Sequence, residues 1–317
     1  MMKPFAYNLR DRVRPEYFFW GALLLSLSLL FGGGAPPAVA DEATPSAPVA
    51  SESAFTHLSL EAKAFSVYDM KTGRDLFADN ADAVLPLASV AKVMTAATAL
   101  SLIPETTLVT ISAEAVGQEG DSHFFVGEQW VLRDLVRFML LESSNDAAYA
   151  VAESVGSIAT STEDRALGRA FFIETLNARA QAMGLVATHF ENESGLDLDE
   201  ARVGAASTAR ETTIFFADAL KRFPTAFTAT TLNDLQLPAA NGVLREARNT
   251  NRDTDKLPLL LASKTGFTDL AGGNLVIAFD ADFGHPIVIA VLGSTEKGRF
   301  SDVEKLVWAT LTELSRH

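Results

Sequence analysis

The chain has 317 residues, of which 48% are hydrophobic and 21% charged, so it can bury a full-sized core and is neither disordered nor fibrous. Its 40 acidic and 26 basic side chains give a formal charge of −14, which argues against nucleic acid as a partner because a polyanion-binding surface needs clustered Lys and Arg. The absence of cysteine excludes disulfides, a thiolate metal site and a cysteine nucleophile.

The first forty residues have the pattern of an export signal. Four basic residues precede an apolar run over 18–31, and the small-residue sequence Ala38-Val39-Ala40 follows it. This order is typical of a secretory signal, and the run is short for a membrane span, which needs ~20 apolar residues. We predict that residues 1–40 are a signal peptide or, if uncleaved, an N-terminal membrane anchor. The remainder is then extracytoplasmic, either secreted, periplasmic or in the cell envelope.

Residues 41–57 are mostly Ala, Ser, Pro, Thr and Glu, which are too poor in large apolar side chains to offset the entropy of ordering. We predict a flexible linker over 41–57. The remaining residues, 58–317, contain no internal repeat and no second linker, and they are predicted to form one catalytic domain.

Strand patterns occur near both ends of this domain. Residues 62–70 and 74–80 flank the turn Lys71-Thr72-Gly73 and predict a hairpin. Three apolar, partly β-branched runs, at 259–267, 273–280 and 286–293, predict three more strands. Apolar residues then recur at helical spacing over 303–314, which predicts a closing helix that packs on the sheet.

The middle of the domain has helical periodicity. Apolar residues recur at three- and four-residue steps over 90–103, 132–141, 145–156, 169–184 and 207–220. The predicted fold is therefore α/β, of the α+β sandwich type: a sheet built from both ends of the domain, with a helical subdomain between them. Clefts between such units are a preferred place for ligand sites.

The pair Ser89 and Lys92 lies where a proline-containing turn leads into the first of these helices. Residues three apart on a helix are neighbours, so the lysine amine can reach the serine hydroxyl and activate it as a nucleophile. A lysine serves as a base only if its surroundings lower its pKa. By itself this pair is weak evidence for catalysis, because Ser is common at helix N-caps and Lys is common on exposed helix surfaces.

Two further motifs follow in the sequence. Ser143 and Asn145 lie at the junction of two predicted helices, which alone indicates only a capping segment. Lys264-Thr265-Gly266 ends an apolar strand and offers a cation, a hydroxyl and an open backbone edge to a substrate carboxylate and amide. SxxK, SxN and KTG in this order are the motif set of penicillin-binding proteins and class A β-lactamases.

From about Glu61 to Trp308 the chain resembles the low-molecular-mass penicillin-binding proteins, the D-alanyl-D-alanine carboxypeptidases. The blocks YDMKTGRDLFADN (68–80), MGLVATHFENESGLD (183–197), NTNR (249–252) and KTGFTDLAGGNLV (264–276) are also similar to that family. The resemblance implies a β-lactamase/DD-peptidase-like fold, a five-stranded antiparallel sheet flanked by helices with a helical subdomain. It further implies peptidoglycan stem peptides as substrate, β-lactams as covalent inhibitors, and no metal or cofactor.

The resemblance also implies individual roles. Ser89 attacks the penultimate D-alanine, Lys92 accepts its proton, and Ser143 relays a proton to the leaving D-alanine. The implied substrate-binding residues are Asn145, Lys264, Thr265, Phe267 through its backbone N–H, and Arg299 near the terminal carboxylate.

Three other functions remain open at this point. A D-alanyl-D-alanine endopeptidase, which cuts cross-links, has the same motifs. A class A-like β-lactamase needs a glutamate that activates water; Glu174 has the wrong spacing because Ile173 stands at that position. A catalytically silent cell-wall binding protein of the same fold is the third alternative. The second KTG, Lys71-Thr72-Gly73, is interpreted as a hairpin turn, and the five histidines show no metal-ligand spacing.

Overall fold

A computed structural model describes residues 53–120 and 122–316. The predicted signal or anchor over 1–40 and most of the predicted linker lie outside the described residues. The strands are β1 Ala64–Asp69, β2 Arg74–Asp79, β3 Leu85–Pro86, β4 Leu108–Thr110, β5 Gln129–Val131, β6 His189–Phe190, β7 Ala205–Ser207, β8 Asp234–Pro238, β9 Leu244–Arg248, β10 Leu260–Thr268, β11 Gly272–Asp280 and β12 Pro286–Ser294. The α-helices are α1 Lys92–Leu102, α2 Ala113–Val116, α3 Leu132–Glu142, α4 Asn145–Thr160, α5 Arg165–Ala182, α6 Ala209–Arg222, α7 Pro224–Thr228 and α8 Gly298–Leu314, with short 3₁₀ turns η1 Ala88–Ala91, η2 Ala229–Thr231 and η3 Thr254–Lys256.

The five long strand patterns form one antiparallel sheet in the order β10-β11-β12-β1-β2. The prediction of a sheet built from both ends of the domain is confirmed, because β1 pairs with β12 across more than two hundred residues of sequence. This order leaves β10, which contains Lys264-Thr265-Gly266, at one edge of the sheet.

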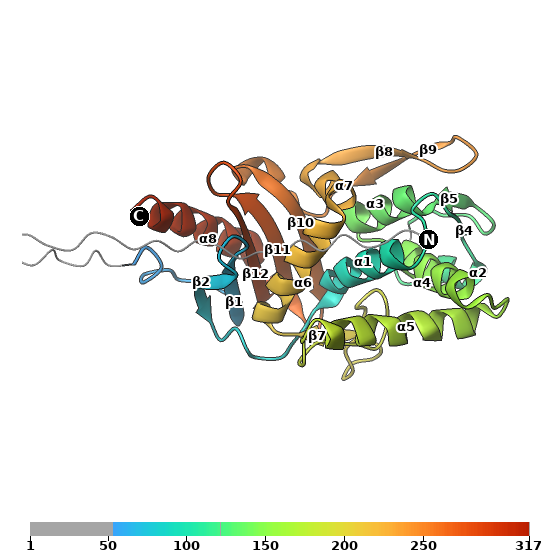
Figure 1. The fold of residues 1–317 in the computed structure, drawn as a ribbon, viewed down its shortest axis with the longest axis horizontal. Coiled ribbons are helices and arrows are strands. Elements are labelled where there is room, and N and C mark those ends of the chain that lie inside the picture. The colour runs from blue at the N-terminus through green and yellow to red at the C-terminus, as the bar shows by residue number, and fades with distance from the viewer. Residues whose placement is uncertain (1–52, 121, 317) are drawn as a thin grey trace, which may run out of the picture. The chain divides into compact units, whose positions relative to one another are not determined.

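Both faces of the sheet are covered. Alternate residues point to opposite faces, so Leu275, Ile277 and Phe279 of β11 join one apolar cluster while Val276 and Ala278 join the other. The first cluster includes the buried Val and Leu side chains of α8, and each such side chain contributes about 1.5–3 kcal/mol of hydrophobic stabilisation. Helix α8 lies against β11 and β12, as its periodicity predicts (Figure 1).

The second face of the sheet carries α6, and beyond it lie α1, α3, α4 and α5 (Figure 1). These elements match the five helical patterns predicted between the two strand groups, although α5 begins four residues earlier, at Arg165. Asp164 explains that earlier start, because its carboxylate accepts the backbone N–H groups of Ala166 and Leu167 and caps the helix. The α+β sandwich with a helical subdomain is therefore confirmed.

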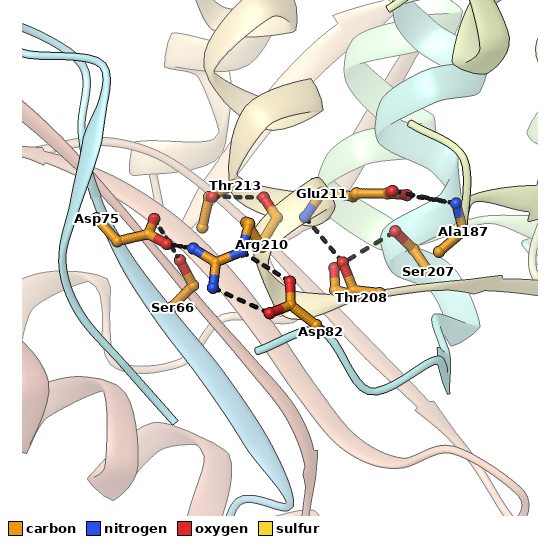
Figure 2. A network of polar contacts seen from close by, with 9 residues as sticks. All are labelled: Ser66, Asp75, Asp82, Ala187, Ser207, Thr208, Arg210, Glu211 and Thr213. Atoms are coloured by element: carbon orange, nitrogen blue, oxygen red, sulfur yellow. Dashed lines mark hydrogen bonds and ion pairs between the residues drawn. The ribbon is translucent and has the colours of Figure 1, made fainter. Parts of the chain in front are cut away.

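The N-terminus of α6 contacts the hairpin β1–β2 (Figure 2). Arg210 forms ion pairs with Asp75 of β2 and with Asp82 just after it, the latter at 2.7 Å between Nε and Oδ1. Thr208 caps the helix by accepting the N–H of Glu211, and the Glu211 carboxylate in turn accepts the N–H of Ala187 at 3.0 Å. These contacts fix β1–β2 and the segment before β6 against one helix terminus.

The prediction of a flexible linker over 41–57 is wrong at its C-terminal end. Residues 53–57 lie in the described part of the chain, and Phe55 is buried there. Its ring stacks on Phe77 of β2 with 4.5 Å between centroids, and the N–H of Ala54 donates to the Glu313 carboxylate at 2.8 Å. The ring contact and the hydrogen bond place the end of this segment against β2 and α8.

The hairpin β8–β9 was not predicted. Its signal is present, because Leu235 and Leu237 alternate with polar residues and Asn241-Gly242 is a typical hairpin turn. The hairpin lies beside α3, since the N–H of Arg248 donates to the Glu142 carboxylate at 2.6 Å.

Among the helices of residues 53–120 and 122–316, none combines the length and hydropathy that crossing a bilayer requires.

Candidate active site

Ser89 lies in the 3₁₀ turn η1, and Lys92 is the first residue of α1. The sequence predicted both residues on one face of a regular helix. A 3₁₀ turn has three residues per turn, so side chains three apart eclipse each other. The Lys92 Nζ therefore lies 2.7 Å from the Ser89 Oγ.

The backbone beside Ser89 is held in an unusual conformation. Ala88 has φ 47°, a left-handed value that residues other than glycine adopt at a cost. Gly195 packs directly on this turn: a Cβ added at Gly195 would lie 1.9 Å from the Ala88 carbonyl oxygen. The loop before β7 thus supports the turn that presents Ser89.

Lys92 is fully buried and its amine has three polar partners. Besides Ser89, the amine contacts the Asn145 Oδ1 at 2.7 Å and the Ser194 backbone oxygen at 3.0 Å. Burial lowers the pKa of Lys92 from 10.5 to about 7, and this outweighs the nearby Glu193 carboxylate, which raises it. About half of the Lys92 amines are therefore neutral at pH 7.

The junction between α3 and α4 places the second motif. Ser143 ends α3 with φ 63°, and the hydroxyl of Ser144 caps α4 by accepting the N–H of Ala147 at 3.0 Å. This sharp reversal puts the Ser143 hydroxyl 2.8 Å from the Lys264 Nζ. Asn145 faces Lys92 through its oxygen, and its Nδ2 donates to the Glu119 backbone oxygen at 2.7 Å.

Lys264 and Thr265 lie on β10 and are almost completely buried. The Lys264 amine donates to the Thr265 backbone oxygen at 2.8 Å as well as to Ser143. Burial, and then the positive charges of Lys92 and Arg299, lower the pKa of Lys264 well below its usual range. Because the two lysines repel each other when both are protonated, a charge on one favours the neutral form of the other.

Strand β10 passes close to the turn that carries Ser89. A Cβ at Gly266 would lie 2.8 Å from the Leu87 backbone oxygen and 3.2 Å from the Ser89 nitrogen, so only glycine fits without a shift. Phe267 follows on the same strand and is 46% exposed. Arg299, in the first turn of α8, is buried and donates from Nη1 to the Gly266 backbone oxygen at 2.7 Å.

The structure therefore brings all three motifs together. Direct contacts link Ser89 to Lys92, Lys92 to Asn145, and Lys264 to Ser143, across 53 and 121 positions of sequence for the last two pairs. The second KTG does not join them, because Lys71, Thr72 and Gly73 form the exposed turn between β1 and β2.

Three residues near the motif residues, Glu193, Ser194 and Thr250, carry no motif of their own in the sequence. Glu193 acts electrostatically on Lys92, Ser194 accepts its hydrogen bond, and the Thr250 hydroxyl lies 2.5 Å from that of Thr265. These residues lie in two sequence blocks that resemble the family, 183–197 and 249–252, and that resemblance was the only sign in the sequence that they belong to the site. Within the described residues, no three His, Asp or Glu side chains converge as a metal site would require.

Solved structures of a DD-transpeptidase and of a penicillin-binding protein have the same fold. The Streptomyces K15 DD-transpeptidase matches with a TM-score of 0.70 at 27% identity, over 80% of this chain and 98% of that one. Penicillin-binding protein D2 from Listeria monocytogenes, solved in an ampicillin-bound form, matches with a TM-score of 0.63 at 29% identity, over 80% and 98%. The fold is that of the DD-transpeptidases and penicillin-binding proteins, as the family resemblance predicted.

Residues 49–296 match the model of the peptidase S11 family, D-alanyl-D-alanine carboxypeptidase, and the chain belongs to that family. It is 30% identical to the D-alanyl-D-alanine carboxypeptidase DacA of Escherichia coli over 78% of this chain, and it spans 60% of that relative's length. It is equally 30% identical to a D-alanyl-D-alanine endopeptidase of Pseudomonas aeruginosa, over 76% of this chain and 74% of that relative.

Proposed function

We propose that this chain is a serine D-alanyl-D-alanine carboxypeptidase, which removes the terminal D-alanine from peptidoglycan stem peptides through an acyl-enzyme. The observation that carries the proposal is the contact of 2.7 Å between the Ser89 hydroxyl and the buried Lys92 amine. Since the pKa of that amine is about 7, a large fraction can accept the serine proton at neutral pH.

In the proposed reaction, the Ser89 Oγ bonds to the carbonyl carbon of the penultimate D-alanine while Lys92 takes its proton. The backbone N–H groups of Ser89 and Phe267 stabilise the resulting oxyanion, which is worth about 3 kcal/mol per donor in other serine hydrolases. The C–N bond then breaks as Ser143 passes a proton to the departing amine, and the proton that Lys92 took from Ser89 replaces it by way of Lys264, which leaves Lys92 neutral again. Water finally attacks the ester and gives a proton to Lys92, which returns it to the Ser89 oxygen as the ester bond breaks.

The proton route to the leaving group is supported by the contacts of Ser143. Its hydroxyl accepts from Lys264 at 2.8 Å, so Lys264 is placed to pass on to Ser143 the proton that Lys92 has taken up. Asn145 orients the substrate amide while its oxygen holds the Lys92 amine. Both roles depend on the left-handed backbone of Ser143, which turns the junction toward β10.

Thr265 is proposed to bind the terminal carboxylate of the substrate. Arg299 adds positive charge near the same strand. Its Nη1 donates to the Gly266 backbone oxygen, and its Nε has no hydrogen-bond partner. The carboxylate thus meets a hydroxyl directly and a buried cation at longer range. This arrangement favours a substrate that ends in a free carboxylate.

The second candidate activity is that of an endopeptidase, which cuts a D-alanyl cross-link instead of a terminal D-alanine. It is favoured by the Pseudomonas aeruginosa endopeptidase, which is as similar to this chain as the carboxypeptidase and is spanned over more of its length. Incubation with pentapeptide monomers and with cross-linked dimers, followed by mass spectrometry, separates the two. Release of D-alanine from monomers with intact dimers supports the carboxypeptidase, and the reverse pattern refutes it.

Two other activities have less support. Glu174 is exposed on α5, so it offers no buried base for the rapid deacylation expected of a class A-like β-lactamase. A silent cell-wall binder would not need a buried lysine amine in contact with a serine. Rapid turnover of a β-lactam would favour the first alternative.

The proposed acylation is tested with a fluorescent penicillin. Wild type is expected to become covalently labelled, and Ser89→Ala to remain unlabelled while keeping its melting temperature. Failure of wild type to label would refute the proposal and favour the silent binder. We place this activity outside the cytoplasm, where the export pattern in the sequence directs the chain and where peptidoglycan is accessible.

A further inference from the structure

Thr250 contacts two parts of the candidate site, the α3–α4 junction and strand β10. It follows β9, and its backbone N–H donates at 3.1 Å to the oxygen of Leu141, two residues before Ser143. Its hydroxyl oxygen lies 2.5 Å from that of Thr265 on β10. One half-buried residue thus contacts both the segment of the second motif and the hydroxyl proposed to bind the substrate carboxylate.

The segment that carries Thr250 is held by its neighbour Asn249. The Asn249 Nδ2 donates to the backbone oxygens of Thr230 and Leu232 at 2.7 and 2.8 Å. Its Oδ1 accepts the N–H of Asn251 at 2.8 Å. These bonds satisfy the Asn249 amide completely on its donor side and fix the backbone on both sides of Thr250, so the position of the Thr250 hydroxyl is set by the fold.

The direction of the hydrogen bond between the two threonines determines what Thr265 can bind. Each hydroxyl has one proton to donate and two lone pairs. Either threonine can be the donor in this pair, and when Thr265 donates, the Thr250 proton can turn to the Leu141 backbone oxygen, 3.4 Å from the Thr250 hydroxyl. A carboxylate only accepts, so Thr265 must give its proton to the carboxylate, and Thr250 must then donate to Thr265. Two hydroxyl oxygens this close without a proton between them would repel each other.

We propose that Thr250 is a positioning residue that orients the Thr265 hydroxyl toward the terminal carboxylate of the substrate. The chain Thr250 to Thr265 to carboxylate is a cooperative series, in which each donor becomes stronger because it also accepts. A terminal carboxamide can both donate and accept, so it is compatible with either direction of the threonine pair. Thr250 therefore strengthens the binding of a free carboxylate, which needs Thr265 as donor, and does not exclude a carboxamide. The inference rests on the proposed DD-peptidase function.

The experiment compares Thr250→Val, which keeps the shape and removes the hydroxyl, with Thr250→Ser, which keeps the hydroxyl. Steady-state kinetics are measured on an N-acylated peptide ending in D-Ala-D-Ala. For Thr250→Val we expect KM to rise about tenfold, equal to the ~1.4 kcal/mol of one lost hydrogen bond, with kcat within about twofold of wild type. Thr250→Ser should restore the wild-type KM.

A second probe reports on the catalytic centre without a carboxylate. An acylaminomethyl boronic acid adds to the Ser89 hydroxyl but presents no carboxylate to Thr265, so its inhibition constant should be unchanged in Thr250→Val. Thr312→Val is the matched control, because its hydroxyl is exposed and donates only within α8, to the Trp308 oxygen at 2.8 Å. It should leave KM, kcat and the inhibition constant unchanged.

The inference is refuted if Thr250→Val leaves KM within twofold of wild type. It is also refuted if that variant weakens boronic acid binding as much as peptide binding, because a general structural role would affect both. If wild type binds the boronic acid but cleaves no peptide, the proposed function fails separately. The inference is then decided by acylation with penicillin, which carries a carboxylate beside the attacked amide: an unchanged acylation rate in Thr250→Val refutes it.

Discussion

The pH dependence of Ser89 acylation tests the buried lysine directly. The base must be the neutral amine of Lys92, whose pKa burial lowers from 10.5 to about 7. A lowered pKa means that the neutral form persists to lower pH, so acylation should begin to fall below about pH 8 and reach half of its maximum near pH 7. An exposed lysine with a pKa of 10.5 would be neutral in only about 3 molecules in 10,000 at pH 7.

The expected magnitude follows from this value. With a pKa of about 7, the neutral fraction is about one tenth at pH 6, one half at pH 7 and nine tenths at pH 8. The second-order rate constant for acylation by a fluorescent penicillin should therefore rise about tenfold from pH 6 to pH 8 and then level off. This rate constant is measured by labelling for fixed times, followed by quenching, in buffers of equal ionic strength. Circular dichroism at each pH confirms that the protein stays folded.

The nearby carboxylate provides a variant with a defined sign. Glu193 raises the pKa of Lys92, so Glu193→Gln should lower that pKa further and move the rise in acylation to lower pH. Glu191→Gln is the matched control, because Glu191 is exposed and pairs with His189 at the surface. A rate that is flat from pH 6 to pH 8, or one that still rises tenfold per unit above pH 9, would refute the assignment of Lys92 as a base titrating near neutrality. A shift toward higher pH in Glu193→Gln would contradict the electrostatic argument.

Two further predictions concern the support of the site. Gly195→Ala should cost about 3 kcal/mol or more and abolish penicillin labelling, because its Cβ would collide with the Ala88 oxygen; Gly184→Ala, at φ 76° in open space, should cost about 1 kcal/mol and preserve labelling. Equal losses in the two variants, measured by urea unfolding, would contradict the steric explanation. Arg210→Met should destabilise the protein by about 1–3 kcal/mol by leaving the Asp75 carboxylate without its cation, and adding Asp75→Asn should recover part of the loss. Additive losses in the double variant would show that the two residues do not interact.

Much of the fold could be predicted because its signals are local. The strands β10, β11 and β12 are continuous apolar runs bounded by turn residues, and α8 repeats its apolar residues at helical spacing. Each pattern depends only on neighbours within a few residues. The family resemblance then supplied the antiparallel sheet and the convergence of the three motifs, neither of which the local patterns determine.

The hairpin β8–β9 and the end of the linker show where local interpretation failed. Asn241-Gly242 with alternating leucines was a sufficient signal for the hairpin. Phe55 gave no such signal, because a single aromatic residue in a polar segment has no periodicity. Its burial depends on Phe77, which is close only after β1 and β2 have folded into the sheet.

Ser89 and Lys92 could be identified from the sequence because a spacing of three residues brings side chains together in any helical turn. The tertiary structure decided the rest. It made this turn 3₁₀, packed Gly195 against it, and placed Glu193, Ser194 and Thr250 around the motif residues. The physical reason is the sequence separation of these contacts, which reaches about a hundred residues between Lys92 and Ser194. Burial also exists only in the folded chain, so the lowered pKa that makes Lys92 a base is a property of the packing around it.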